Sequence, residues 1–133
     1  MKVSILCFDL SSNAAGRADL LARLLAPRYE VEVVGPTFGP AVWSPVRGGG
    51  IGYQSVPGAR YPRFARVIPG LLRLADGDLL YASKPPPTSL GIGLLKHFTS
   101  GCPLLLDIDD WEVGFFYRAG LWGRVGRFLN LAN

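Results

Sequence analysis

Short apolar runs that alternate with segments of helical spacing are the feature that most limits how this chain can fold. The five runs cover residues 2–8, 29–35, 53–57, 78–83 and 103–108. Apolar strands of this length are typical of a parallel sheet that is buried on both faces. A strand, a helix and a second strand within about 35 residues form the βαβ unit of such sheets. The alternation predicts an α/β fold: a doubly wound, Rossmann-like parallel sheet of about five strands with helices on both faces.

The segments between and after these runs carry helical signals. In the first segment four leucines recur at helical spacing, and Pro27 ends the pattern. In the second, Pro69 and Gly70 should kink or split the helix. The third should begin at a Thr or Ser cap. Helices are therefore expected over residues 14–26, 64–75, 88–98 and 115–133.

Size and composition favour one globular domain. The chain has 133 residues, of which 49% are hydrophobic, so it can bury a core. No internal repeat or domain boundary is visible, and residues 1–133 are expected to form a single domain. The net charge of +4 comes mostly from scattered arginines. This charge suits anionic substrates or a membrane surface, whereas the absence of any basic run argues against nucleic acid.

Cysteine content and hydropathy bear on the compartment. Cys7 and Cys102 are the only cysteines, and both lie beside apolar runs. Two cysteines are too few for a disulfide scaffold, so buried free thiols in a reducing compartment are expected. The sequence has no secretory-signal pattern and no window of roughly 18 uncharged apolar residues. A cytoplasmic location is therefore expected.

Open α/β sheets bind ligands beyond the carboxyl ends of their strands. That rule selects the loops at residues 9–16, 36–50, 84–88 and 109–114. In the first loop, Asn13, Ala15 and Gly16 could present backbone N–H groups to an anion at a helix start, with Gly16 allowing close approach. An ordinary helix start capped by Ser and Asn explains the same residues. The glycines at 48–50 follow no strand and are interpreted as a flexible loop.

The run "PLLLDIDDWE" at residues 103–112 places four carboxylates at the end of the fifth apolar run. Asp109 and Asp110 should fall just past the strand, within reach of a substrate. An Asp-x-Asp pattern can bind a divalent metal, but no second ligand cluster is visible, so no metal site is expected. Alternatively, Asp109 or Asp110 caps a short helix that contains Glu112.

Two other polar residues bear on the location of the site. Lys84 follows the fourth apolar run and is interpreted equally well as an anion ligand or as an exposed loop lysine. His97, the only histidine, lies at the end of a predicted helix away from the site edge. A catalytic triad or a zinc site is therefore not expected.

The segments "KVSILCFD…AGRADLLARLLAPRYEVEVVGP", "FGPAVWSPVRG", "GDLLYASKPPPTSLGIGLL" and "PLLLDIDDWE" resemble, in this order, the opening of family 4 glycosyltransferases, which have the GT-B fold. The resemblance implies the N-terminal, acceptor-binding half of a retaining enzyme whose donor-binding domain is absent from this chain. Nucleotide sugar and acceptor would then be ligands of the complete enzyme, and no cofactor is implied. Many members have a His near the transferred sugar where this chain has Asp109, which makes Asp109 the candidate catalytic residue.

The resemblance also assigns binding roles. Asp110 and Glu112 would contact acceptor or sugar hydroxyls, and Gly16 matches a position whose backbone approaches the donor phosphate or the acceptor. The chain alone is expected to be inactive: either it is a truncated product or it works with a separate donor-binding chain. The alternative is a stand-alone, non-catalytic Rossmann-like binding or interaction module.

The last predicted helix suggests contacts beyond this domain. Trp122, Phe128 and Leu129 lie on one of its faces, with arginines on the other. Such a face usually packs on a core. It can also support self-association, binding to a partner chain or peripheral contact with a membrane.

Overall fold

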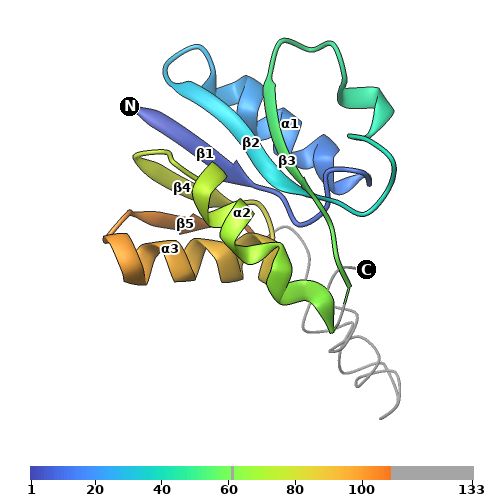
Figure 1. The fold of residues 1–133 in the computed structure, drawn as a ribbon. Coiled ribbons are helices and arrows are strands. Elements are labelled where there is room, and N and C mark those ends of the chain that lie inside the picture. Colours follow the sequence, from blue (N-terminus) through green and yellow to red (C-terminus); the bar gives the residue numbers. More distant parts are fainter. Residues whose placement is uncertain (61, 109–133) are drawn as a thin grey trace.

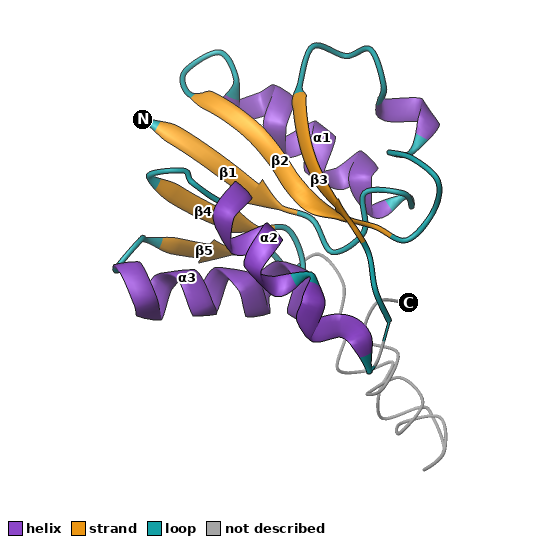
Figure 2. Ribbon diagram, in the orientation of Figure 1, coloured by secondary structure: helices purple, strands orange, loops and turns teal. Residues whose placement is uncertain are grey.

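The computed structural model describes residues 1–60 and 62–108 (Figure 1). Within this range one sheet carries helices on both of its faces (Figure 2). The predicted helix at 115–133 and the candidate residues Asp109, Asp110 and Glu112 lie outside the described residues.

The five predicted strands form a single, all-parallel sheet. Its order is β3-β2-β1-β4-β5, which confirms the predicted α/β fold with a Rossmann-like parallel sheet. The chain builds outward from β1 first on one side and then on the other, so the winding direction switches between β1 and β4. The strands are β1 (Lys2–Leu6), β2 (Glu30–Thr37), β3 (Gly52–Pro57), β4 (Leu79–Ala82) and β5 (Leu104–Leu106).

Successive residues of β1 point to opposite faces and build two apolar layers. Val3 and Ile5 are buried beneath α1 (Ala14–Leu25). Leu6 is buried in the opposite layer with residues of α2 (Ile68–Leu74) and α3 (Ile92–Ser100). Both faces of β1 are therefore covered, and its buried polar residue Ser4 is satisfied by donating its hydroxyl to the Glu32 carboxylate at 2.7 Å.

The helices follow the predicted segments with two changes. The segment predicted at 64–75 is split into the 3₁₀ helix η2 (Arg63–Arg66) and α2, and Pro69 lies in the first turn of α2, where a missing N–H costs little. The third helix begins with a π-helical turn, η3 (Pro87–Gly91), without a side-chain cap. The predicted Thr or Ser cap is therefore wrong, because the Ser89 hydroxyl donates to the Leu6 carbonyl at the end of β1 and the Thr88 hydroxyl to the Phe8 carbonyl just beyond it. A further 3₁₀ turn, η1 (Ser44–Val46), lies before β3.

Glycines allow close backbone approaches in two places. A Cβ atom on Gly35 would lie 2.4 Å from the carbonyl oxygen of Cys7, so β2 needs a glycine where it passes the end of β1. Gly48 and Gly50 have φ angles of 81° and 79°, and between them a Cβ atom on Gly49 would overlap the Arg23 guanidinium of α1. These glycines thus let the loop pack against α1.

In the described part of the chain, no helix combines the length and the apolar character needed to cross a membrane.

Candidate functional site

The carboxyl ends of the parallel strands meet along one edge of the sheet. The loop after β1 (9–13), the loop after β2 (38–43) and the loop after β4 (83–86) all lie there. The segment after β3 begins at the same edge and includes η2, and the sequence analysis did not select it. Ligands of such sheets bind where the winding direction switches, which here is between β1 and β4.

A buried carboxylate ties the first two of these loops together. Asp9 is 8% exposed and accepts hydrogen bonds from the backbone N–H of Ser11 at 2.8 Å and from its hydroxyl at 2.5 Å. The Ser11 oxygen accepts in turn from the N–H groups of Phe38 at 3.1 Å and Gly39 at 2.8 Å. Asp9 therefore fixes the loop after β1 against the loop after β2, on the β1 side of the switch point.

The first turn of α1 uses its own backbone donors. The Ala15 N–H donates to the Ser12 carbonyl at 3.1 Å, and the Gly16 N–H donates to the Asn13 carbonyl at 3.0 Å. Ala15 is fully buried, while Asn13 is exposed and makes no side-chain cap. These bonds engage two of the donors expected to face an anion, so the anion contact at Asn13, Ala15 and Gly16 stays a prediction.

The close approach at Gly16 is made by an aromatic ring. A Cβ atom on Gly16 would lie 3.0 Å from the indole of Trp43. The backbone N–H of Trp43 donates to the Leu10 carbonyl at 2.7 Å, and this bond fixes the loop that carries Trp43 over the start of α1. Packing against Trp43 is therefore a sufficient physical reason for the glycine.

An ion pair crosses the switch point from α1 to β5. Arg17 Nε and Nη2 lie 2.8 and 2.6 Å from the same Asp107 oxygen, Oδ2. The Asp107 side chain is 15% exposed and that of Arg17 35%. Tyr81 lies close to both groups: burial and the nearby Asp107 charge raise the pKa of its hydroxyl, and the Arg17 charge opposes them. A cation, a carboxylate and a phenol thus gather above β4.

Three buried hydroxyl groups hold the loop after β4 against the chain at the end of β1. Ser83 and Ser89 both donate to the Leu6 carbonyl, at 2.9 and 2.6 Å, and Thr88 donates to the Phe8 carbonyl at 2.8 Å. All three side chains are buried. The bonds satisfy carbonyl groups at the end of β1 and hold the loop after β4, including its π-helical turn, against the switch point.

Lys84 and Cys7 lie near each other below these loops. Lys84 itself is half-buried. Burial of the Cys7 thiol raises its pKa to about 12, and the nearby positive charge of Lys84 acts in the opposite direction. Cys7 is thus a neutral core thiol that donates to the Asp9 carbonyl at 3.5 Å. Both cysteines are free, as predicted, but Cys102 is half-buried rather than buried because it precedes an edge strand.

The described groups at this edge offer hydrogen bonds and charge. His97 lies at the opposite edge, where its Nδ1 is 2.8 Å from the Cys102 carbonyl oxygen. Over residues 1–60 and 62–108, no group of acids, histidines and cysteines has the arrangement of a metal site. The edge offers Arg17 and Lys84 as cations and Asp9 and Asp107 as acceptors, a set suited to hydroxyl-rich or anionic ligands.

Sequence reasoning missed Asp9, Arg17, Tyr81 and Asp107 as members of this site. Asp9 and Asp107 directly follow apolar runs, and this position was the available signal. Arg17 was not identifiable, because its partner lies 90 residues away in the sequence. Lys84 was correctly placed at this edge, whereas Asp109, Asp110 and Glu112 lie outside the described residues.

Comparisons of this chain with protein-family models, with curated proteins and with solved structures found no match.

Proposed function

We propose that this chain is the acceptor-binding half of a glycosyltransferase that moves a sugar from a nucleotide-sugar donor to an acceptor. In this proposal the chain acts together with a donor-binding domain that faces the carboxyl edge of the sheet. The resemblance of four ordered segments to family 4 glycosyltransferases with the GT-B fold is the sequence argument for it.

One structural observation supports the proposal most directly. Polar side chains from the first turn of α1, from the loops after β1 and β4 and from the end of β5 gather where the sheet changes winding direction. This is the position at which open α/β sheets bind ligands. Carboxylate acceptors beside cationic donors match the alternating needs of sugar hydroxyls, each of which both donates and accepts.

The roles follow from the positions. Asp107 and Arg17 would contact acceptor hydroxyls from the β5 side, and the Asp9 loop would close the site from the β1 side. Lys84 would bind the most negatively charged group of the ligand. Catalysis needs groups from both walls of a cleft, so the chain alone should bind weakly and turn over nothing.

Saturation-transfer NMR on the 133-residue chain tests this function. The probes are glucose, N-acetylglucosamine, UDP-glucose and GDP-mannose. Binding of at least one probe is expected, at a roughly millimolar dissociation constant because only one wall of the cleft is present. Thr88→Val should weaken it, since it removes one of the three hydroxyl bonds that hold the loop after β4, namely the bond to the Phe8 carbonyl. Thr99→Val removes an exposed hydroxyl on α3 and is the matched control. Failure of every probe to bind contradicts the proposal.

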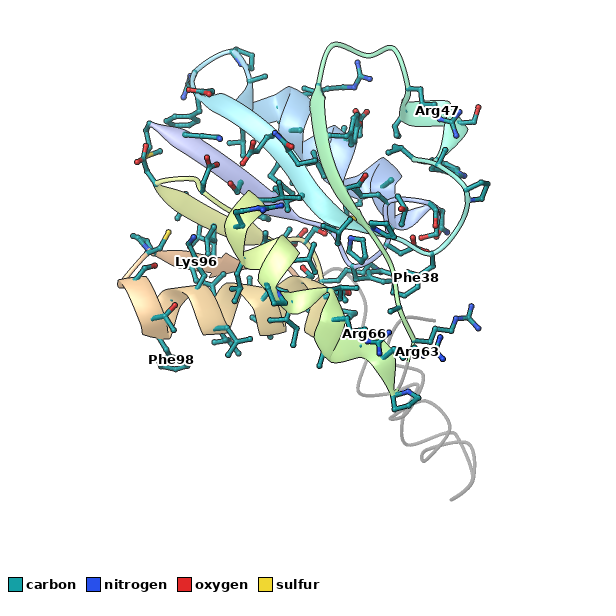
Figure 3. The ribbon with its side chains drawn as sticks, viewed as in Figure 1. Phe38, Arg47, Arg63, Arg66, Lys96 and Phe98 are labelled. Atoms are coloured by element: carbon teal, nitrogen blue, oxygen red, sulfur yellow. The ribbon has the colours of Figure 1, made fainter. Side chains whose placement is uncertain are left out.

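A stand-alone interaction module is the second candidate, and the outer side of α3 favours it. Leu94, Leu95 and Phe98 are 39%, 43% and 79% exposed, whereas Ile92 of the same helix is buried in the core. Figure 3 shows Phe98 pointing away from the sheet. A helix that is apolar on both sides is typical of a buried position. Sedimentation of Phe98→Asp against the wild type distinguishes the candidates, because a module that uses this surface loses self-association or partner binding.

A further inference from the structure

The sequence segment around β3 carries positive charge without carboxylates. Between Val33 and Ala75 the sequence contains no Asp, Glu or Lys, and its charged residues are Arg47, Arg60, Arg63, Arg66 and Arg73. Two of these, Arg63 and Arg66, form the ends of η2 and are exposed. Since β3 is parallel to the other strands, η2 lies at the same carboxyl edge as the candidate site.

The geometry of η2 brings the two arginines together. In a 3₁₀ helix, residues three apart lie one above the other, so Arg63 and Arg66 extend from the same side. Figure 3 shows both labelled side chains at the end of the ribbon beyond β3. Among residues 1–60 and 62–108, neither guanidinium has a carboxylate within ion-pair distance. Like charges three residues apart on one side of a helix repel each other, and a bound anion relieves this repulsion.

The backbone of η2 is fixed to the core. Phe64 packs among the buried residues beneath α2, and the Val67 N–H donates to the Phe64 carbonyl at 3.1 Å. The preceding strand end is held as well, because the Gly58 N–H donates to the Thr37 carbonyl at 2.7 Å. A fixed backbone reduces the conformational entropy that the arginine pair loses when it binds a ligand.

We propose that Arg63 and Arg66 bind a phosphate group of a small soluble ligand. Planar guanidinium groups donate paired hydrogen bonds to phosphate oxygens, and two of them can hold one phosphate from adjacent sides. The further claim that this phosphate belongs to a phosphorylated acceptor rests on the proposed function. In that case the sugar-like part of the acceptor lies toward the switch point and its phosphate lies on η2.

Titration calorimetry at low salt tests the phosphate site, with inorganic phosphate, glucose 6-phosphate and glucose as probes. Arg63→Ala and Arg66→Ala should each weaken phosphate binding roughly tenfold or more, as loss of a charge-assisted hydrogen bond predicts. Arg63→Lys should lose part of the affinity, because lysine keeps the positive charge but lacks the paired N–H donors of a planar guanidinium. Arg73→Ala makes the same charge change in the last turn of α2 and should leave binding unchanged.

The outcomes separate the two proposals. Phosphate binding that depends on Arg63 and Arg66, with no contribution from the sugar, supports this site and counts against the acceptor role. Sugar binding without any effect of these two arginines overturns the site and leaves the proposed function standing. Binding only to phosphatidylglycerol vesicles, with soluble phosphates inactive, also overturns it. Equal losses in Arg63→Ala and Arg73→Ala do the same, because they indicate a general effect of charge.

Discussion

Arg17 in the first turn of α1 and Asp107 at the end of β5 form an ion pair with a closest distance of 2.6 Å. The pair connects elements on opposite sides of the switch point, since β4 lies between β1 and β5 in the sheet. It therefore couples the edge strand to the helix that covers the centre of the sheet.

Asp107→Asn should lower the free energy of unfolding by about 1 kcal/mol, because the pair is only partly buried. Urea unfolding followed by circular dichroism measures this loss. Glu30→Gln at the exposed start of β2 is the control and should change stability by less than about 0.5 kcal/mol. Equal effects of the two substitutions would show that the ion pair contributes nothing specific.

Asp9→Ala should loosen the loops after β1 and β2 together. It removes the acceptor for both Ser11 bonds and should cost about 1–3 kcal/mol of stability. Hydrogen exchange should speed up at the amides of Ser11, Phe38 and Gly39. Asn13→Ala, which changes an exposed residue of the same loop, should leave these rates unaltered. Unchanged exchange in Asp9→Ala would contradict the role given to this carboxylate.

Gly35→Ala should be the more harmful of two glycine substitutions. Its Cβ atom would lie 2.4 Å from a backbone oxygen that cannot move aside, so a loss above about 2 kcal/mol is expected. Gly52→Ala meets no atom within 4 Å and should be neutral or slightly stabilising. Thermal unfolding of both variants tests the packing of β2 against the end of β1. Similar midpoints would contradict it.

Cys7 should make stability depend on alkaline pH. Burial raises its pKa from 9.0 to about 12, so the unfolded state releases this proton before the folded state does. The free energy of unfolding should therefore fall as the pH rises from about 9 toward 12, by up to about 1.4 kcal/mol per pH unit for one group. In Cys7→Ala the fall should be shallower. Equal slopes in the two proteins would mean that the thiol is not protected in the folded state.

Thiol labelling provides an independent test of the same burial. Iodoacetamide at pH 8 should modify Cys102 slowly in the folded chain, because that side chain is half-buried with a raised pKa. Cys7 should react only after unfolding. Mass spectrometry of peptides from labelled protein distinguishes the two sites.

The sheet was predictable because its signal is local. Apolar runs and helical spacing repeat along the whole chain, and helix α1 ends within a residue of its prediction. The strands β1, β4 and β5 are shorter than predicted, since apolar composition continues past the point where the ladder ends. Thus the Cys7 N–H still donates to the Val34 carbonyl at 2.8 Å, but the chain then turns away.

The site was less predictable because its contacts are not local. Arg17 and Asp107 are 90 residues apart, so no helical or strand periodicity in the sequence predicts their contact. The hydroxyls of Thr88 and Ser89 donate to the Phe8 and Leu6 carbonyls rather than capping their own helix. Gly16 was predicted to allow close approach of a ligand; within the chain the approaching group is the Trp43 ring, and the ligand contact stays a prediction. Sequence patterns locate an edge of the sheet, whereas tertiary pairing decides which side chains face it.

Amide chemical-shift mapping of the uniformly ¹⁵N-labelled chain tests the central claim most directly, namely that ligands bind at the carboxyl edge between β1 and β4. Titration with UDP-glucose and with glucose 6-phosphate should shift amides in the segments 9–13, 38–43 and 83–89, and glucose 6-phosphate should also shift those of residues 63–66 in η2. Amides near His97 and Cys102 at the opposite edge should stay fixed. Shifts centred on the opposite edge, or on the outer side of α3, would contradict the account and favour the interaction module.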